Sequence, residues 1–276
     1  MISSSPASYS YNFKRWSFIL EGNMAQQKIK NEVIFETLRF MINETDEMDP
    51  DLINFVRGLI NKPSQKQLNL IKMNRVHYSQ YNESKLIDKM LNGKRKGFNV
   101  EALAFDGETF SNSLFFEKER DFSGILIEPL PLSYERLLEK NRKFYSINAY
   151  IAQKVPTVAK FKMFKEGVFS GRSKSLKYSK NEPPIYEFIY VPCFSIQTIL
   201  AALNVKTVNL FYLDVEGVEL DVLRSINFDR IKIKSFVIEH KHSSKDQLIK
   251  ILGDQNFKLF HEDTMNLFFI NKLNNI

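Results

Sequence analysis

The chain has 276 residues, of which 43% are hydrophobic and 24 are Phe, so it is long and apolar enough to bury a sizeable core. Its net charge of +7, from 39 basic and 32 acidic residues, is spread over both halves and does not by itself indicate a nucleic-acid partner. Cys193 is the single cysteine, which excludes an internal disulfide and a cysteine-based zinc site. No apolar stretch approaches the roughly 20 residues that span a bilayer, so we expect no transmembrane segment and a soluble chain.

The first 80 residues are expected to form a helical, partly disordered extension that packs on the main domain, residues 81–276. Residues 1–12 are rich in Ser and Tyr and lack periodicity, which is typical of disorder. Apolar residues at helical spacing predict a helix between Asn23 and Met41. A second amphipathic helix follows Asp49-Pro50 and ends at Pro63; its apolar positions are Leu52, Ile53, Val56 and Ile60.

From residue 84 onward the chain alternates between helical and strand patterns, which is typical of right-handed βαβ units around a parallel sheet. The expected strands are 98–105, 124–128, 144–151, 186–194, 208–213 and 235–238, followed by 258–261 and 267–270, which are close enough to pair as a hairpin. The expected helices are 84–92, 110–119, 133–142, 196–203, 218–226 and 243–252. Residues 157–180 break the pattern: the first part could be a strand or a loop, and the polar, basic run 170–181 predicts an exposed insertion.

Four of the expected strands end in an acidic residue. Asp106, Glu128, Asp214 and Glu239 each follow an apolar run. Because the carboxyl ends of strands in an open α/β sheet converge on one crevice, we expect these carboxylates to gather there. Such a site favours a cationic or polyhydroxyl ligand over a polyphosphate.

Glu128 lies where nucleotide-binding folds place an acid that accepts the ribose hydroxyls; the alternative is an ordinary exposed Glu at a strand end. Gly107 is the only glycine of the first turn, and the absence of a G-x-G-x-x-G loop argues against a dinucleotide or ATP. S-adenosylmethionine fits these features because it has a ribose, an adenine and a sulfonium but no phosphate. A carboxylate about 5 Å from the sulfonium would attract it by roughly 3 kcal/mol at an effective dielectric near 20.

The histidines give less information. His240 follows Glu239 at a strand end and could act as a general base; a hydrogen-bonded histidine at the sheet edge is the alternative. His77, His242 and His261 show no metal-ligand spacing, which argues against a metal site. The sequence also lacks a G-x-S-x-G elbow and a Cys-His signature, which argues against a hydrolase.

Several stretches together resemble the FkbM-type methyltransferase domain, and most closely its animal Star-like branch. They are GFNVEALAFDGETFSNSLFFEKERDFSGILIEPLP, LLEKNRKFYSINAYI, SIQTILAALNVKTVNLFYLDVEGVELDVL and IKIKSFVIEH. The resemblance runs from about Asp49 to Ile270. The order and separation of DGET-SN, LIEP and DVEG-EL make it specific. It implies a Rossmann-like, seven-stranded S-adenosylmethionine-dependent methyltransferase fold that ends in an antiparallel hairpin.

The resemblance also implies roles for particular residues. Glu128 would bind the ribose, Asn148 would lie near the adenine, and Asp214, Glu216 and Gly217 would stand beside the methyl-transfer position. The first cofactor loop would consist of Glu101, Leu103, Ala104, Asp106 and Gly107. Leu103 replaces a glycine of the family pattern. Its side chain would either occupy cofactor volume or turn into the core and leave the pocket intact.

The implied activity is methyl transfer to a hydroxyl of a small molecule or glycan, with Asp214 or His240 as the proton acceptor. The alternative is a non-enzymatic Star-like adaptor that recruits membrane-protein cargo in the secretory pathway, in the endoplasmic reticulum and Golgi. Star-like relatives usually carry a membrane anchor, so this chain is expected to be a fragment or a soluble copy. An RNA-binding methyltransferase has only the net charge in its favour, and we expect no nucleic-acid partner.

Overall fold

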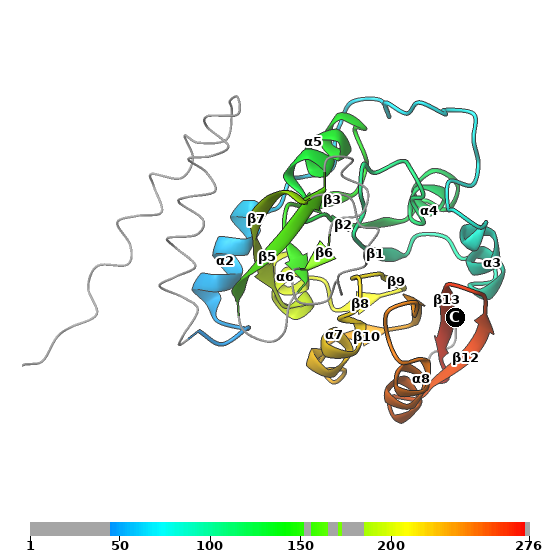
Figure 1. Ribbon diagram of the computed structural model, residues 1–276. Helices are drawn as coiled ribbons and strands as arrows, with labels where there is room; N and C mark the ends of the chain where they lie inside the picture. Colours follow the sequence, from blue (N-terminus) through cyan, green and yellow to red (C-terminus); the bar gives the residue numbers. More distant parts are fainter. Residues whose placement is uncertain (1–44, 152–155, 165–170, 173–184, 274–276) are drawn as a thin grey trace, which may run out of the picture.

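The computed structural model describes residues 45–151, 156–164, 171–172 and 185–273 (Figure 1). The disorder expected for residues 1–12, the helix expected between Asn23 and Met41, and most of the insertion expected at 170–181 lie outside the described residues. Among the residues that the structure describes, no helix is long and apolar enough to cross a membrane.

The main element is a seven-stranded sheet in the order β12-β13-β11-β9-β1-β2-β3. Five neighbouring strands are parallel, and β13 pairs antiparallel with both β11 and β12. The strands are β1 (Phe98–Ala102), β2 (Ser123–Ile127), β3 (Tyr145–Ile147), β9 (Leu210–Leu213), β11 (Ser235–Glu239), β12 (Phe257–Glu262) and β13 (Asn266–Asn271). The mostly parallel α/β sheet and its final antiparallel pair are confirmed.

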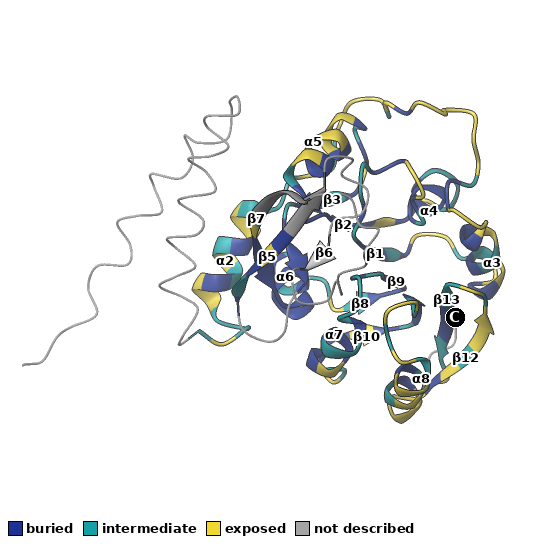
Figure 2. Cartoon of the chain, in the orientation of Figure 1, coloured by how far each residue is buried: buried dark blue, intermediate teal, exposed yellow. Residues whose placement is uncertain are grey.

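Both faces of this sheet are covered because its strands are apolar on both sides. On one face, Val100, Ile125 and Phe211 belong to a large buried cluster with residues of four helices. On the other face, Leu126 and Tyr212 pack against three helices. The first face is covered by α2 (Pro50–Leu59), α6 (Ile196–Ala202), α7 (Glu219–Ser225) and α8 (Lys245–Asp254), and the second by α3 (Glu83–Met90), α4 (Leu114–Arg120) and α5 (Pro131–Glu139). Figure 2 shows the buried strands between partly exposed helices.

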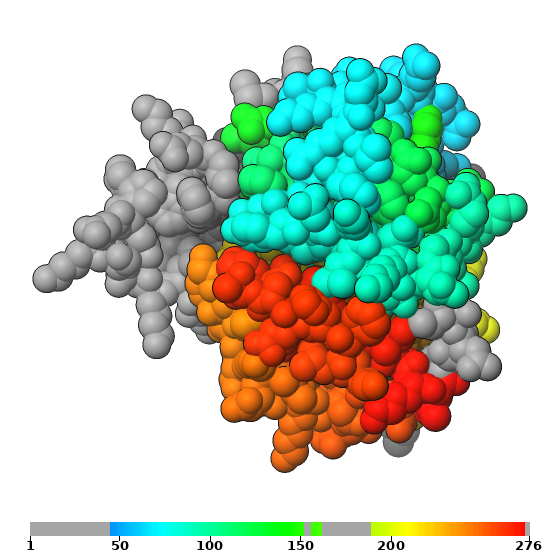
Figure 3. Space-filling view, turned by 90° about the vertical axis from the view of Figure 1, so that its right-hand side faces the viewer, coloured from blue at the N-terminus to red at the C-terminus, as the bar shows by residue number. Residues whose placement is uncertain are grey.

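The N-terminal helix α2 is part of the packed structure. Asp49 caps it by accepting hydrogen bonds from the backbone N–H groups of Asp51 and Leu52. Leu52 and Val56 are buried in the same cluster as the central strands, where α2 packs against α6. The chain then runs from Asn61 to Asn82 as an extended strap without a helix. In Figure 3 the strap (cyan) shares one face of the molecule with the C-terminal hairpin (orange to red).

Two smaller sheets complete the fold. One has the order β4-β7-β5-β6, so the segment that could be a strand or a loop is a strand, β5, at its start. The other pairs β8 with β10. Their strands are β4 (Tyr150–Ile151), β5 (Thr157–Phe164), β6 (Gly171–Arg172), β7 (Ile185–Phe194), β8 (Thr207–Val208) and β10 (Lys232–Ile233).

Several element boundaries differ from the sequence expectation. The helix expected to end at Pro63 ends at Leu59, and the expected strand 208–213 is divided between β8 and β9, which belong to different sheets. The first strand ends at Ala102 instead of residue 105, because the backbone turns into the left-handed region at Leu103 (φ 55°). The expected strand 144–151 is divided between β3 and β4, which belong to different sheets. The helix expected from residue 110 begins only at Leu114, because Ser111 to Ser113 bind the carboxylate of Glu101 instead.

Candidate functional site

The loop after β1 is held in place by Glu101. This buried carboxylate accepts hydrogen bonds from the hydroxyl groups of Ser111 and Ser113 and, at 2.6 Å, from the backbone N–H of Asn112. Glu101 thus connects the end of β1 to the segment that precedes α4. This position suits an acid that shapes a cofactor loop, since the loop geometry depends on its charge-assisted hydrogen bonds.

Within this loop, Asp106 and Gly107 form a tight turn. Asp106 Oδ1 accepts hydrogen bonds from the backbone N–H groups of Glu108 (2.9 Å) and Thr109 (2.6 Å). Gly107 has φ 75°, and a Cβ there would lie 3.0 Å from Cγ of Leu137. The turn therefore requires glycine for both its conformation and its packing.

Leu103 occupies a left-handed backbone position that L-residues rarely adopt. Its side chain is half-buried and packs against the large core cluster. The neighbouring Ala104 is buried on the opposite face, and its N–H donates to the carbonyl of Ile127 at 3.1 Å. This hydrogen bond links the loop after β1 to the last residue of β2.

Glu128 completes that connection. Its Oε2 accepts from the N–H of Phe105 and its Oε1 from the N–H of Leu130, both at 2.8 Å. Burial raises the pKa of Glu128 to about 8, against the opposing effect of these two hydrogen bonds. Asn148 supports the same turn, since its Nδ2 donates to the carbonyls of Glu128 (2.8 Å) and Pro129 (3.0 Å). Glu128 is therefore a buried carboxyl group rather than an exposed strand-terminal Glu.

Two buried ion pairs fix the outer side of the loop. Arg142 pairs with Glu117 at 2.7 Å and also donates to the carbonyl of Gly107. Lys140 pairs with Glu108 at 2.9 Å, and Glu108 also accepts the N–H groups of residues 71 and 72 in the strap. The pKa of Glu108 is lowered by its hydrogen bonds, although burial acts in the opposite direction. These two ion pairs could not be predicted from the sequence, because their members are distant along the chain and only the fold brings them together.

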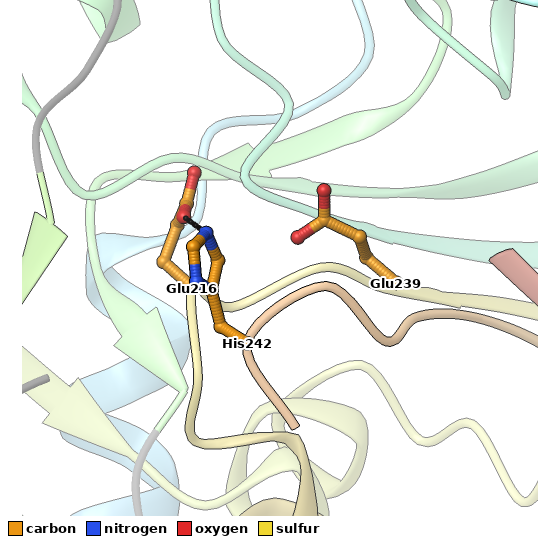
Figure 4. Close-up of side chains that lie close together, drawn as sticks. All are labelled: Glu216, Glu239 and His242. Atoms are coloured by element: carbon orange, nitrogen blue, oxygen red, sulfur yellow. Dashed lines mark ion pairs between the residues drawn. The ribbon is translucent and has the colours of Figure 1, made fainter. Parts of the chain in front are cut away.

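Acidic side chains also gather at the carboxyl ends of β9 and β11. Asp214 directly follows β9. Glu239 ends β11, and Glu216 lies in the loop after β9 (Figure 4). Burial, followed by the neighbouring charges of Glu239 and Glu216, raises the pKa of Asp214 well above its usual value. Burial and nearby carboxylates also raise the pKa values of Glu216 and Glu239. The expected convergence of carboxylates is therefore present for this pair of strands.

Comparison with known proteins identifies the chain's family. A family model described as the methyltransferase FkbM domain matches residues 101–259, which is more than half of the chain. The chain belongs to the FkbM methyltransferase domain family. None of the curated proteins that were compared matches it. The family match contains every residue for which the sequence analysis implied a role in cofactor binding or catalysis.

Similar solved structures carry related descriptions, all at low identity. A methyltransferase FkbM from Methylobacillus flagellatus is 15% identical, with a TM-score of 0.39, and the match covers 63% of this chain and 43% of that protein. An S-adenosylmethionine-dependent O-methyltransferase from Thermotoga maritima is 11% identical, with a TM-score of 0.39 and coverages of 83% and 73%. A fibrillarin from Aeropyrum pernix with bound S-adenosylmethionine is 15% identical, with a TM-score of 0.40 and coverages of 74% and 87%. The chain thus spans less than half the length of the first of these proteins. The matches do not distinguish a Star-like branch within the FkbM family.

In this FkbM domain, the side chain of His240 contacts the C-terminal hairpin. Its Nε2 lies 3.3 Å from the carbonyl of Asp263 in the turn between β12 and β13. The histidine that contacts an acid at this edge is His242, whose Nε2 lies 3.6 Å from Glu216 Oε2. The sequence carried a signal for His242, since this residue comes three positions after Glu239, the last residue of β11. Its linear spacing from the other histidines, however, does not match a metal-ligand motif.

Proposed function

We propose that this FkbM domain binds S-adenosylmethionine at the carboxyl ends of β1, β2 and β9 and transfers its methyl group to a hydroxyl oxygen. The acceptor would be a small molecule or a glycan. The observation that carries this proposal is the buried carboxyl group of Glu128, which lies at the end of β2 and connects to the loop after β1.

The residues around Glu128 suit the cofactor. Each carboxyl oxygen accepts one backbone N–H. With its raised pKa the group is a protonated carboxyl at neutral pH, so it keeps one O–H donor and further acceptor capacity for ribose hydroxyl groups. The packing of Leu103 against the core supports the alternative in which this side chain leaves the cofactor pocket intact. Glu101 and Asp106 would hold the loop beside the methionine part, and Asn148 would hold the turn beside the adenine.

Bound S-adenosylmethionine would supply an electrophilic methyl carbon on a positively charged sulfur. Asp214, Glu216 and Glu239 place three carboxyl groups at the neighbouring strand ends, and a sulfonium beside them would lower their raised pKa values and favour their ionised forms. Asp214 would accept the proton that the acceptor hydroxyl loses, because a raised pKa makes an ionised carboxylate a stronger base. His240 is the second predicted proton acceptor.

Calorimetric titration of S-adenosylmethionine into the full chain tests the cofactor part. We expect one site per chain and micromolar affinity, lost by at least about tenfold in Glu128→Ala. Mass spectrometry of a panel of hydroxyl-bearing acceptors then tests for a gain of one methyl group. Absence of binding up to about 1 mM would contradict the proposed methyltransferase activity and favour the adaptor role that the Star-like resemblance implies.

A further inference from the structure

Three potential metal ligands come together at the edge of the sheet. The ligand atoms of Glu216, Glu239 and His242 all lie within 4.8 Å of one another. Figure 4 shows the three side chains directed toward the same space. Glu216 comes from the loop after β9, Glu239 from the last position of β11, and His242 from the turn that follows. Because β9 and β11 are parallel neighbours, the fold itself brings these loops together.

We propose that Glu216, Glu239 and His242 bind a divalent first-row transition-metal cation, such as Mn²⁺ or Zn²⁺. One imidazole nitrogen and two carboxylate oxygens form a donor set that such ions accept, whereas Mg²⁺ and Ca²⁺ prefer oxygen alone. Ligand atoms about 2.1 Å from one ion in a tetrahedral arrangement lie about 3.4 Å apart. The 3.6 Å between Glu216 and His242 is already close to this value.

The charges around the three ligands favour a cation. Asp214, Glu216, Glu219 and Glu239 place four carboxyl groups in this region. Oδ1 of Asp214 is buried and, among the described residues, has no hydrogen-bond partner. A buried acceptor without a partner carries a desolvation cost that a nearby cation would relieve. A cation held by the three ligands would also offset the mutual repulsion of the ionised carboxylates gathered there.

The two ligand-bearing loops are held rigidly, which a metal site requires. Glu219 accepts the backbone N–H groups of Val215 (3.1 Å) and Gly217 (3.0 Å) and so fixes the loop on either side of Glu216. The same carboxylate accepts the hydroxyl of Ser243, the residue that follows His242. Glu219 thus joins the loop that carries one ligand to the turn that carries another. Its oxygens are occupied by these bonds, so it acts as a positioning residue.

The site is accessible to solvent and has room for further ligands. The side chains of His242 and Glu216 are 42% and 34% exposed. Three protein ligands leave at least one coordination position open, as in catalytic rather than structural metal sites. If the proposed methyl transfer holds, the ion would bind the acceptor oxygen and lower the pKa of its hydroxyl group. This last step rests on the proposed function, whereas ion binding itself does not.

The test uses the full chain, treated with EDTA and returned to chelator-free buffer, with MnCl₂ alone as the probe. Electron paramagnetic resonance measures free Mn²⁺, and ZnCl₂ is then added as a competitor. We expect saturable binding of one Mn²⁺ per chain, displaced by Zn²⁺, with at least a tenfold loss of affinity in Glu216→Gln, Glu239→Gln and His242→Ala. The matched control is Glu262→Gln, which removes another partly exposed carboxylate and should bind as the wild type does.

Circular dichroism in EDTA checks that each variant folds. His242→Ala changes a half-exposed side chain in a turn, so it keeps the test decisive even if Glu239→Gln unfolds. No saturable binding below about 1 mM, or unchanged affinity in His242→Ala and Glu216→Gln, would overturn the proposal and leave an ordinary ion pair. Titration of S-adenosylmethionine in EDTA reports on the proposed function separately, so either idea can fail alone.

Discussion

The carboxylate of Glu128 accepts a hydrogen bond from the backbone N–H of Phe105 at 2.8 Å, and this contact joins the end of β2 to the loop after β1. The second carboxylate oxygen accepts the N–H of Leu130. One buried acid therefore shapes both turns that would surround a nucleoside. The proposed cofactor site and the local stability of the sheet edge depend on the same side chain.

Replacing Glu128 with Ala should weaken both the proposed cofactor binding and the stability of the folded state. Two backbone N–H groups would lose their acceptor, and we expect a fall of about 2 to 4 kcal/mol in the free energy of unfolding. Urea denaturation measures this change. The matched control is Glu135→Ala on the exposed face of α5, which should change stability by less than about 0.5 kcal/mol. Equal effects of the two substitutions would contradict the structural role of Glu128.

The raised pKa of Glu128 predicts a pH dependence of stability. The folded state holds this proton up to about pH 8, whereas the ordinary pKa is 4.5. The stabilising contribution is therefore fully present below about pH 4.5 and is lost as the pH rises to about 8, by about 3 to 5 kcal/mol. Urea denaturation at pH 5.5 and 8.5 should show a smaller decrease in Glu128→Gln than in the wild type. Other acidic groups titrate in both proteins, so a decrease of the same size in both would count against this assignment.

The left-handed conformation of Leu103 predicts that two small substitutions differ in their effect on stability. Leu103→Gly relieves a backbone cost of about 1 to 2 kcal/mol but loses side-chain packing, so we expect stability within about 1 kcal/mol of the wild type. Leu103→Ala loses the packing and keeps the backbone cost, and it should be less stable by about 1 to 2 kcal/mol. Thermal and urea denaturation compare the two. An Ala variant as stable as the Gly variant would show that the backbone at this position is not strained.

The buried pair of Arg142 and Glu117 predicts a large loss of stability. Arg142→Met leaves the carboxylate of Glu117 buried without its charge partner, and we expect a loss of about 3 to 5 kcal/mol. Since Arg142 also donates to the carbonyl of Gly107, the variant should bind S-adenosylmethionine more weakly at a temperature where it is still folded. Arg136→Met, at an exposed position of α5, is the control and should leave both quantities unchanged. A mild effect at Arg142 would mean that the pair contributes little to the loop.

The order of the elements could be predicted from the sequence because each strand is a short apolar run bounded by polar turns. The family resemblance was equally accessible, since DGET-SN, LIEP and DVEG-EL are local motifs. Boundaries were harder. The end of β1 at Ala102 depends on a left-handed residue inside an apolar run, Leu103. The late start of α4 depends on the carboxylate of Glu101, which binds Ser111, ten residues further along the chain.

The candidate site was predictable only in part. The convergence of Asp214 and Glu239 follows from strand order, which alternation along the chain indicates. The contact between Glu216 and His242 joins two loops 26 residues apart, and no linear spacing encodes it. The orientation of His240 toward Asp263 likewise depends on how the C-terminal hairpin packs beside β11. The sequence therefore indicated the edge of the sheet where acidic side chains gather, and the fold determines which of these side chains meet.

The most direct test of the central claim is a calorimetric titration of S-adenosylmethionine into the full chain, with Glu128→Ala and Glu135→Ala measured in parallel. The account predicts one site with micromolar affinity in the wild type and in Glu135→Ala, and at least about tenfold weaker binding in Glu128→Ala. No binding to the folded wild-type chain up to about 1 mM would contradict it.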